Sequence, residues 1–242
     1  MPRFYAPEKL APGAHVRLPD NAAVHASRAL RMKVGDAAVL FNGDGNDYPC
    51  ELTFMSKSEV SARVKAVSVN HSESPLHITL IQAISSGDRM DFTIQKAVEL
   101  GVNRIQPVSS QRSVVKLSGE RAEKRREHWQ NVVISACEQC GRAVIPSVMP
   151  TLSLPQWLAQ TQTGALRLLL SPDAAQNLSD LPRPSAPIQL LIGAEGGLTQ
   201  EEVRLATDHD FIPIRLGKRI LRTETAALTA IASLQILWGD FN

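Results

Sequence analysis

The sequence contains little cysteine, which limits the cross-links and metal sites it can form. It has three cysteines in 242 residues, of which Cys137 and Cys140 form a C-x-x-C pair. A disulfide framework uses more cysteines than this, and a zinc site needs four ligands, but no second pair and no H-x-x-x-H is present. Because the pair ends a helical pattern over residues 120–139, just before Gly141, we expect helix-end thiols and no metal.

The sequence also lacks an apolar segment long enough to cross a membrane, which takes roughly 18 consecutive apolar residues. Its longest apolar stretch, residues 226–238, is interrupted by Thr229, Ser233 and Gln235. Residues 1–13 carry charges and three prolines where a signal peptide has an apolar core. We therefore expect a soluble, cytoplasmic protein with no membrane partner. The net charge of +2 permits a nucleic-acid partner but does not require one.

Two common phosphate-binding motifs are absent as well. The P-loop pattern G-x-x-x-x-G-K-[ST] is not met at Gly217, where Lys218 is followed by Arg219 and the upstream glycine is missing. The dinucleotide-binding pattern G-x-G-x-x-G is not met after Ile84, where the sequence continues S-S-G-D. These absences argue against a P-loop NTPase and against a standard dinucleotide-binding enzyme.

The chain divides into two regions with different patterns, and its length can hold two ordinary domains. In residues 1–71, β-prone runs flank the Asn-Gly and Asp-Gly pairs of residues 42–45, which is a hairpin signal. Together with a short helix over residues 22–31, this pattern predicts a small β-barrel-like domain. Residues 70–75 are polar, end in Pro75 and have the composition of a linker.

Residues 72–242 alternate between strand and helix patterns. Strands are expected at residues 76–84, 104–108, 165–170, 188–192 and 211–216, and helices at 88–100, 120–139 and 154–160. Interleaved strands and helices favour an α/β domain with a largely parallel sheet covered on both faces. Residues 226–238 are apolar on more than one face, which indicates a helix that is deeply buried or packs against another subunit.

Two glycine-bearing turns near the end of the chain are its most informative feature. Gly193, Gly196 and Gly197 follow the strand expected at residues 188–192, and Gly217 follows the strand expected at residues 211–216. Each turn precedes a helix, so backbone groups lie at the carboxyl end of a strand, where open α/β sheets bind ligands. Glycine permits positive φ and a close approach to the backbone. A tight turn that needs glycine for its geometry alone is the alternative.

The residues beside the first turn define the start of its helix. Thr199 and Glu202 form a capping box. Glu195 lies at the tip of the loop, where we expect a carboxylate to gain nothing from packing, and this favours a functional role.

The second turn adds a cluster of charge. Arg219, Arg222 and Glu224 lie close together in the sequence, and Thr223 is the expected N-cap of the last helix. The alternative for Glu224 is a structural one, since a carboxylate near a helix start suits the helix dipole.

These residues carry a resemblance to a known family. The segments I-G-A-E-G-G-L-T-x-E-E and L-G-K-R-I-L-R-T-E-T-A resemble the signature of the SPOUT methyltransferases. They are most similar to the ribosomal RNA small subunit methyltransferase E family, which makes 3-methyluridine in 16S rRNA. Blocks at residues 87–90, 95–102, 111–115 and 138–142 match that family, and residues 41–45 match the hairpin of its PUA-like barrel. Ala194 stands where the family usually has proline, but the glycines are retained.

The resemblance implies a fold, a cofactor and an assembly. It implies a PUA-like β-barrel RNA-binding domain at residues 1–71, a trefoil-knotted α/β methyltransferase domain at residues 72–242, and a homodimer. It also implies that loops of the knot bind S-adenosylmethionine. The implied cofactor residues are Leu169, Leu170, Ser171, Ile192, Gly193, Glu195, Gly196, Gly197, Leu216, Gly217, Ile220, Leu221 and Arg222.

The implied reaction transfers a methyl group to N3 of a uridine in the 16S rRNA of the small ribosomal subunit. Because this imide nitrogen is a poor nucleophile until its proton leaves, catalysis needs positioning, a proton acceptor and positive charge near the carbonyl oxygens. On residue type and position, we assign Arg222 to orientation or anion stabilisation and Glu224 to the role of base or orienter.

Basic residues in both regions are candidates for RNA contact. They are Arg3, Arg17, Arg28, Arg31, Lys33, Arg112, Lys116 and Arg142. The alternative for each is a solvated surface charge. Two other functions stay open: methylation of a different RNA nucleoside by a related enzyme, and RNA binding without catalysis. Intact Gly193, Gly217 and Arg222 argue against a module that has lost its activity.

Overall fold

The structure, a computed structural model, describes residues 1–57, 59–115, 117–160 and 164–241. The chain divides into two compact units, Met1–Glu73 with Ile134–Ile145 and Ser74–Val133 with Pro146–Asn242. Helix α3 (Gly119–Cys140) therefore contributes its first part to the second unit and its last turns to the first. Among the described residues, no helix is long and apolar enough to cross a lipid bilayer.

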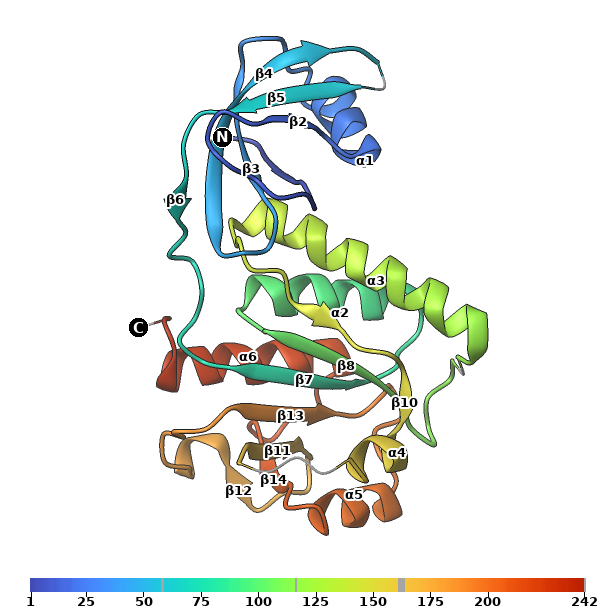
Figure 1. Ribbon diagram of the computed structural model, residues 1–242. Helices are drawn as coiled ribbons and strands as arrows, with labels where there is room; N and C mark the ends of the chain where they lie inside the picture. The colour runs from blue at the N-terminus through green and yellow to red at the C-terminus, as the bar shows by residue number, and fades with distance from the viewer. Residues whose placement is uncertain (58, 116, 161–163, 242) are drawn as a thin grey trace. The chain divides into compact units, whose positions relative to one another are not determined.

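The first unit is built on a sheet with the strand order β1-β3-β4-β5-β2, with β6 paired to β4 (Figure 1). Its strands are β1 (Arg3–Tyr5), β2 (His15–Arg17), β3 (Ala37–Phe41), β4 (Asn46–Met55), β5 (Val60–Val64) and β6 (Ser68–Val69). The predicted hairpin is confirmed, because β3 and β4 pair antiparallel across a turn in which Gly43 and Gly45 have positive φ. Only β1 and β3 run parallel among the described pairs of this sheet.

The helix of the first unit differs from the prediction. Helix α1 (Asp20–Val24) is followed by a π-helical turn, η1 (His25–Ala29), whereas the sequence predicted one helix over residues 22–31. The backbone N–H of Leu30 donates to the carbonyl of His25, five residues back, and this wider turn ends the helix. Arg31 then adopts a left-handed conformation with φ of 52°, which no helix continues.

The second unit contains a sheet with the order β10-β8-β7-β13-β11-β14-β12, in which every described pairing is parallel. Its strands are β7 (Ile78–Ala83), β8 (Arg104–Ser109), β9 (Ser147–Val148), β10 (Leu152–Ser153), β11 (Leu166–Leu170), β12 (Gln176–Asn177), β13 (Ile188–Ile192) and β14 (Ile212–Arg215). Its other helices are α2 (Gly87–Glu99), α4 (Leu154–Leu158), η2 (Leu178–Asp180), α5 (Gln200–Thr207) and α6 (Thr223–Trp238).

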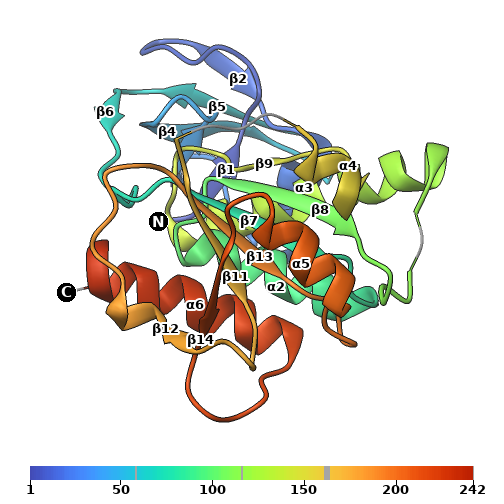
Figure 2. The ribbon, with the colours of Figure 1, turned by 90° about the horizontal axis from the view of Figure 1, so that it is seen from below.

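Helices cover both faces of this parallel sheet (Figure 2). Trp157 of α4 and Ala206 of α5 pack with Leu191 of β13 in one apolar cluster. Because side chains alternate along a strand, the buried Leu190 points to the opposite face, where α2 and α6 pack together. The predicted parallel sheet with helices on both faces is confirmed.

A buried glutamine in α6 ties three segments of the second unit together. Gln235 is fully buried, its Oε1 accepts from the Ser74 hydroxyl at 2.8 Å, and its Nε2 donates to the Leu100 carbonyl at 2.9 Å. Leu100 is the C-cap of α2, so this bond satisfies a carbonyl that the helix end leaves free. Gly101 packs against the same amide: its φ is +88°, and a Cβ there would lie 2.6 Å from Gln235 Nε2.

Replacing Gly101 with alanine should destabilise the second unit by roughly 2–4 kcal/mol, because it adds left-handed strain and displaces the Gln235 amide from its partners. Urea unfolding followed by tryptophan fluorescence measures this loss, since Trp129, Trp157 and Trp238 all belong to the second unit. Gly119→Ala is the matched control, because Gly119 also has positive φ but its Cβ would meet no described atom within 4 Å. Equal losses in the two variants would contradict the role given to Gln235.

Candidate functional site

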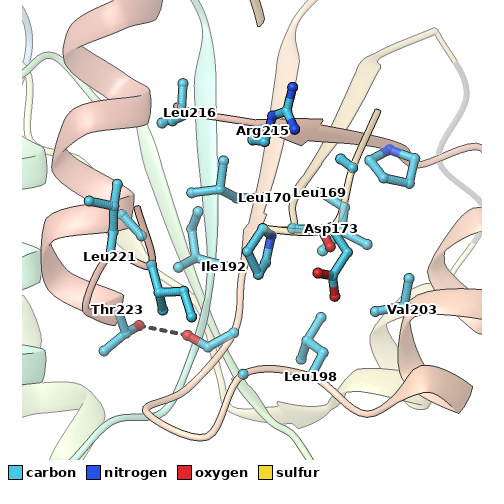
Figure 3. A pocket seen from close by; sticks show the side chains of 18 of the residues that line it. Leu169, Leu170, Asp173, Ile192, Leu198, Val203, Arg215, Leu216, Leu221 and Thr223 are labelled. Atoms are coloured by element: carbon cyan, nitrogen blue, oxygen red, sulfur yellow. Dashed lines mark hydrogen bonds between the residues drawn. The ribbon is translucent and has the colours of Figure 1, made fainter. Parts of the chain in front are cut away.

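The two glycine turns line a single cavity of about 930 Å³ in the second unit (Figure 3). The loop that follows β11 completes its wall. The predicted cofactor residues that line the cavity are Leu169, Leu170, Ser171, Ile192, Gly193, Glu195, Gly196, Gly197, Leu216, Gly217, Ile220 and Leu221. Arg222 is not among the described lining residues. The structure therefore brings together all but one of these residues, and their role in binding a cofactor stays a prediction.

The order of the strands explains why these segments meet. Strand β11 pairs in parallel with β13 on one side and with β14 on the other. Parallel neighbours end at the same edge of a sheet, so the loops after all three strands lie side by side although they are far apart in the sequence. This edge is the place where open α/β sheets bind ligands.

The glycines of the first turn meet different steric demands. A Cβ on Gly193 would lie 2.9 Å from the carbonyl carbon of Gly197 and 3.1 Å from the nitrogen of Leu198, so a side chain there would prevent the turn from closing. Gly197 itself has φ of +69°. A Cβ on Gly196 would lie 3.2 Å from the Cβ of Arg112. Close approach and positive φ both require glycine here.

Arg112 lies in the loop after β8 and contacts the first turn. Its Nη1 donates to the carbonyl of Gly196 at 2.7 Å and to that of Leu198 at 3.4 Å. These bonds give the turn's carbonyls a cationic donor, and such bonds are stronger than neutral ones. The sequence assigned Arg112 to RNA, and the structure adds a structural contact beside the cavity.

The predicted capping box at the start of α5 is confirmed. The Thr199 hydroxyl accepts from the backbone N–H of Glu202 at 3.2 Å, and Glu202 Oε2 accepts from the N–H of Thr199 at 2.9 Å. The other oxygen of Glu202 accepts from the backbone N–H of Gln111 at 2.7 Å. The cap therefore also ties the helix to the loop that carries Arg112.

Glu195 anchors the first turn to the start of α2. Its Oε1 accepts from the backbone N–H of Ser86 at 2.9 Å, from the Ser86 hydroxyl at 2.8 Å and from Arg89 Nη1 at 3.2 Å. Burial alone would raise the pKa of Glu195, but the hydrogen bonds from Ser86 and Arg89 outweigh it and hold that pKa below its ordinary value. We expected this carboxylate to gain nothing from packing, but it gains hydrogen bonds and an ion pair from the start of a helix that is distant in sequence.

Thr223 is not the N-cap of α6, as the sequence predicted. Arg222 occupies the N-cap position and Thr223 is the first helical residue. The Thr223 hydroxyl donates to the carbonyl of Gly193 at 2.6 Å (Figure 3). It also accepts from Gln82 Nε2 at 2.9 Å. The hydroxyl therefore bonds across to the other glycine turn and not to its own helix.

Further residues line the cavity that the sequence did not assign to the cofactor. Four of them had been singled out for other reasons, namely Arg112, Ala194, Arg219 and Thr223. The others were missed: Pro172, Asp173, Ala174, Ala175, Gln176, Leu198, Gln200, Val203, Arg204, Ile212, Pro213, Arg215 and Ala226. Asp173 projects toward Leu198 and Val203 (Figure 3). Asp173 could have been predicted from the sequence, because it lies just after the strand expected at residues 165–170. Val203 and Arg204 could not, because it is the packing of α5 that places them at the cavity.

The two predicted catalytic residues lie beside the cavity's second turn and not in its described wall. Arg222 is exposed at the start of α6. Glu224 follows in the first helical turn, and its Oε2 is buried without a hydrogen-bond partner among the described residues. Their catalytic roles stay predictions.

The predicted RNA contacts of the first unit fall into two groups, one exposed and one buried or half-buried. Arg28, Arg31 and Lys33 are exposed at the end of η1 and in the turn that follows it. Arg17 is also exposed and lies 3.8 Å from Asp20. Lys116, predicted for the second region, lies outside the described residues.

The second group, the buried Arg142 and the half-buried Arg3, forms ion pairs inside the first unit. Arg142 is 3% exposed, and its Nε and Nη2 donate to the two oxygens of Glu73 at 2.9 and 2.6 Å. Arg3 Nη2 lies 2.9 Å from Asp47 Oδ1. These guanidinium groups have structural partners here, and their contact with RNA stays a prediction.

The cysteines carry free thiols. Burial raises the pKa of Cys137 to about 12 and that of Cys50 to about 11, so both thiols stay protonated at neutral pH. Among the described residues, no three His, Cys, Asp or Glu side chains form a group that could hold a metal ion.

Replacing Glu195 with glutamine should lower the melting temperature at neutral pH, and the difference from the unmodified protein should shrink in acid. Because the folded-state pKa is lowered, the carboxylate's contribution is complete above roughly pH 5 and is lost as the pH falls through the lowered pKa. Thermal unfolding at neutral pH and at about pH 3 measures the difference. Glu120→Gln is the control, since its ion pair with Lys124 is exposed. A difference that persists unchanged in acid would rule out this linkage.

Comparison with known proteins identifies the family to which the chain belongs. Residues 72–235 match the model of the RNA methyltransferase domain, and residues 18–65 match that of the RNA methyltransferase PUA domain. Ribosomal RNA small subunit methyltransferase E of Buchnera aphidicola subsp. Schizaphis graminum (strain Sg) is 37% identical over 100% of this chain and 98% of its own. Its counterpart in Bacillus subtilis (strain 168) is 34% identical over 89% of each chain.

Solved structures agree with these relatives. The crystal structure of ribosomal RNA small subunit methyltransferase E from Neisseria gonorrhoeae bound to S-adenosyl methionine is 47% identical, with a TM-score of 0.93 over 100% of both chains. A putative methyltransferase from Legionella pneumophila in complex with the same cofactor is 40% identical, with a TM-score of 0.94 over 99% of this chain and 98% of the other. On these matches, the chain belongs to the ribosomal RNA small subunit methyltransferase E family.

Proposed function

We propose that the protein transfers a methyl group from S-adenosylmethionine to N3 of a uridine in the 16S rRNA of the small ribosomal subunit. The observation that carries this proposal is the single cavity between the two glycine turns, where the predicted cofactor residues converge. Relatives with similar sequences are named as rRNA methyltransferases, and two solved relatives hold S-adenosylmethionine.

The cavity has the character that this cofactor needs. Leu170, Ile192, Leu216 and Leu221 supply apolar surface around one part of it, suited to the faces of an adenine ring (Figure 3). Gly197 lines the cavity with bare backbone, and a Cβ there would meet no described atom within 4 Å, so its backbone N–H and C=O groups can approach a ligand closely. These residues would hold the adenosine and methionine parts of the cofactor.

Bound S-adenosylmethionine supplies a methyl group on a positively charged sulfur. The residues of the chain must then prepare the uridine, whose N3 has to lose a proton before it can attack. The carboxylate of Glu224 would accept this proton or orient the group that does. The guanidinium of Arg222, exposed at the start of α6, would stabilise the negative charge that develops on the uracil carbonyl oxygens.

The RNA surface that we propose includes the exposed Arg28, Arg31 and Lys33 of the first unit. Three basic residues so close together in the chain can neutralise neighbouring phosphates, which makes RNA affinity fall steeply with salt. A target uridine inside a structured RNA must also leave its stack to enter the cavity. Filter binding of 16S rRNA to a triple charge-reversal variant tests this surface.

The finer architecture belongs to the same proposal. We propose that residues 1–71 form a PUA-like β-barrel RNA-binding domain and that residues 72–242 form the trefoil-knotted methyltransferase domain of the SPOUT family. The family models and the similarity to the Neisseria gonorrhoeae structure support this assignment. A cytoplasmic location follows from the proposed substrate.

Methylation of 16S rRNA from cells that lack the protein tests the function directly. The purified protein with S-adenosylmethionine should yield 3-methyluridine by nucleoside mass spectrometry, and calorimetry should detect cofactor binding. In the same assay, Arg222→Ala should reduce turnover roughly tenfold or more but leave cofactor affinity within about threefold, because the guanidinium acts on the uridine.

Lys218→Ala is the matched control, since Lys218 is an exposed cation of the same turn. Normal turnover in Arg222→Ala would refute the role of Arg222. A different methylated nucleoside would identify another substrate base, and RNA binding without cofactor binding would identify a non-catalytic module.

A homodimer is also part of the proposal, supported by exposed apolar residues at the end of the chain. Ile236, Leu237 and Phe241 are 56%, 42% and 47% exposed. Equilibrium sedimentation should return twice the chain mass of 26.4 kDa, and an Ile236→Asp, Leu237→Asp variant should shift the protein toward single chains. The single-chain mass for the unmodified protein would disprove the dimer.

A further inference from the structure

A chain of hydrogen bonds joins the centre of the parallel sheet to both glycine turns. Gln82 ends in an amide whose Nε2 donates to the Thr223 hydroxyl at 2.9 Å, and this hydroxyl donates to the carbonyl of Gly193 at 2.6 Å (Figure 3). Gln82 is fully buried and Thr223 is 6% exposed. Gly193 begins the first turn, and Thr223, which itself lines the cavity, lies two residues after Leu221 of the second turn.

The direction of each bond in this chain is determined by its neighbours. The amide nitrogen of Gln82 also donates to the carbonyl of Ala83 at 3.0 Å, and a carbonyl can only accept. The nitrogen therefore faces Thr223, so the threonine hydroxyl must accept from it. The hydroxyl proton is then directed to the carbonyl of Gly193, which again can only accept.

This bond gives the Gly193 peptide a hydrogen-bond donor from outside its own turn. Gly193 has no side chain to restrict its backbone, and a Cβ there would collide with Gly197. Because a trans peptide is planar, the direction of the Gly193 carbonyl also sets the direction of the N–H of Ala194, which lines the cavity. The Thr223 hydroxyl thus helps to hold the orientation of this one peptide of the first turn.

Gln82 is well placed to anchor this series of hydrogen bonds. It lies in β7, where it pairs with Ile192 of β13 on one side and with Pro107 of β8 on the other. A side chain from the middle of a parallel sheet has little freedom, so its hydrogen bond ties the Thr223 hydroxyl to the core of the sheet. The second turn is joined to the first at this hydroxyl.

We propose that Thr223 is a positioning residue of the cofactor site, oriented by Gln82, which holds the two glycine turns in the arrangement that binds S-adenosylmethionine. This inference rests on the proposed function, because it assumes that the cavity holds that cofactor. Thr223 acts through the Gly193 peptide and takes no part in the chemical step.

Thr223→Val tests the role of the hydroxyl, since valine keeps the shape and removes the donor. The dissociation constant for S-adenosylmethionine, measured by calorimetry on the full chain, should rise on the order of tenfold or more, because the Gly193 carbonyl loses its donor and the peptide can turn. Thr223→Ser keeps a hydroxyl and should bind within about threefold of the unmodified protein. In methyl transfer, KM for the cofactor should rise more than kcat falls.

Thr93→Val is the matched control for a general loss of stability. Thr93 is also buried, and its hydroxyl donates to the carbonyl of Arg89 at 2.8 Å, but it does not line the described cavity. Its valine variant should lower the melting temperature without changing cofactor affinity. Gln82→Met provides a second test if Thr223→Val does not fold, since it leaves the hydroxyl in place without its orienting donor, and it should weaken binding by about threefold or more.

The outcomes separate this inference from the proposed function. Absence of cofactor binding to the unmodified protein would refute the proposed function and the inference with it. Normal binding to the unmodified protein together with normal binding to Thr223→Val would refute the inference alone. Equal weakening in Thr223→Val and Thr93→Val, or no recovery in Thr223→Ser, would also overturn it, because the effect would then not depend on the hydroxyl at this position.

Discussion

The parallel pairing of β11 with both β13 and β14 is the constraint on which the candidate site depends. Three strands that run in the same direction end at one edge, so the segments that follow them must meet there. None of these segments could form the cavity alone, since each contributes only part of its wall. The helices on the two faces hold the sheet in place, and the buried β13 at its centre places the first glycine turn.

A site made largely of backbone needs support from outside its own turns, because glycine gives close approach at the expense of rigidity. The first turn receives this support from three sides. Arg112 donates hydrogen bonds to carbonyls of the turn, Glu195 accepts hydrogen bonds from the start of α2, and Thr223 donates one to the carbonyl of Gly193. These contacts come from loops or helix ends that are remote in sequence, and together they replace the restriction that side chains would otherwise supply.

Local patterns predicted much of the fold and the outline of the site. Apolar runs located β13 without error, and the box of Thr199 and Glu202 is observed as predicted, because strand burial and helix capping depend on neighbouring residues. The prediction failed where a long-range contact competes with a local one. Thr223 has the side chain of an N-cap, but its hydroxyl bonds Gly193 instead, and the helix begins one residue earlier. The helix expected over residues 22–31 ends early in a π-helical turn for which the sequence holds no pattern.

The sequence by itself determined the main strands and helices of the second region and the two glycine turns. Through family resemblance it also indicated part of the cavity's lining. These features depend on local periodicity and on short motifs that can be recognised in the sequence. Only the tertiary structure decided the strand order that unites the turns, the burial of Arg142 against Glu73, and the partners of Glu195 and Thr223. The physical reason is that a hydrogen bond depends on distance and direction in space, and chain segments far apart in sequence acquire these only when the sheet and its helices have packed.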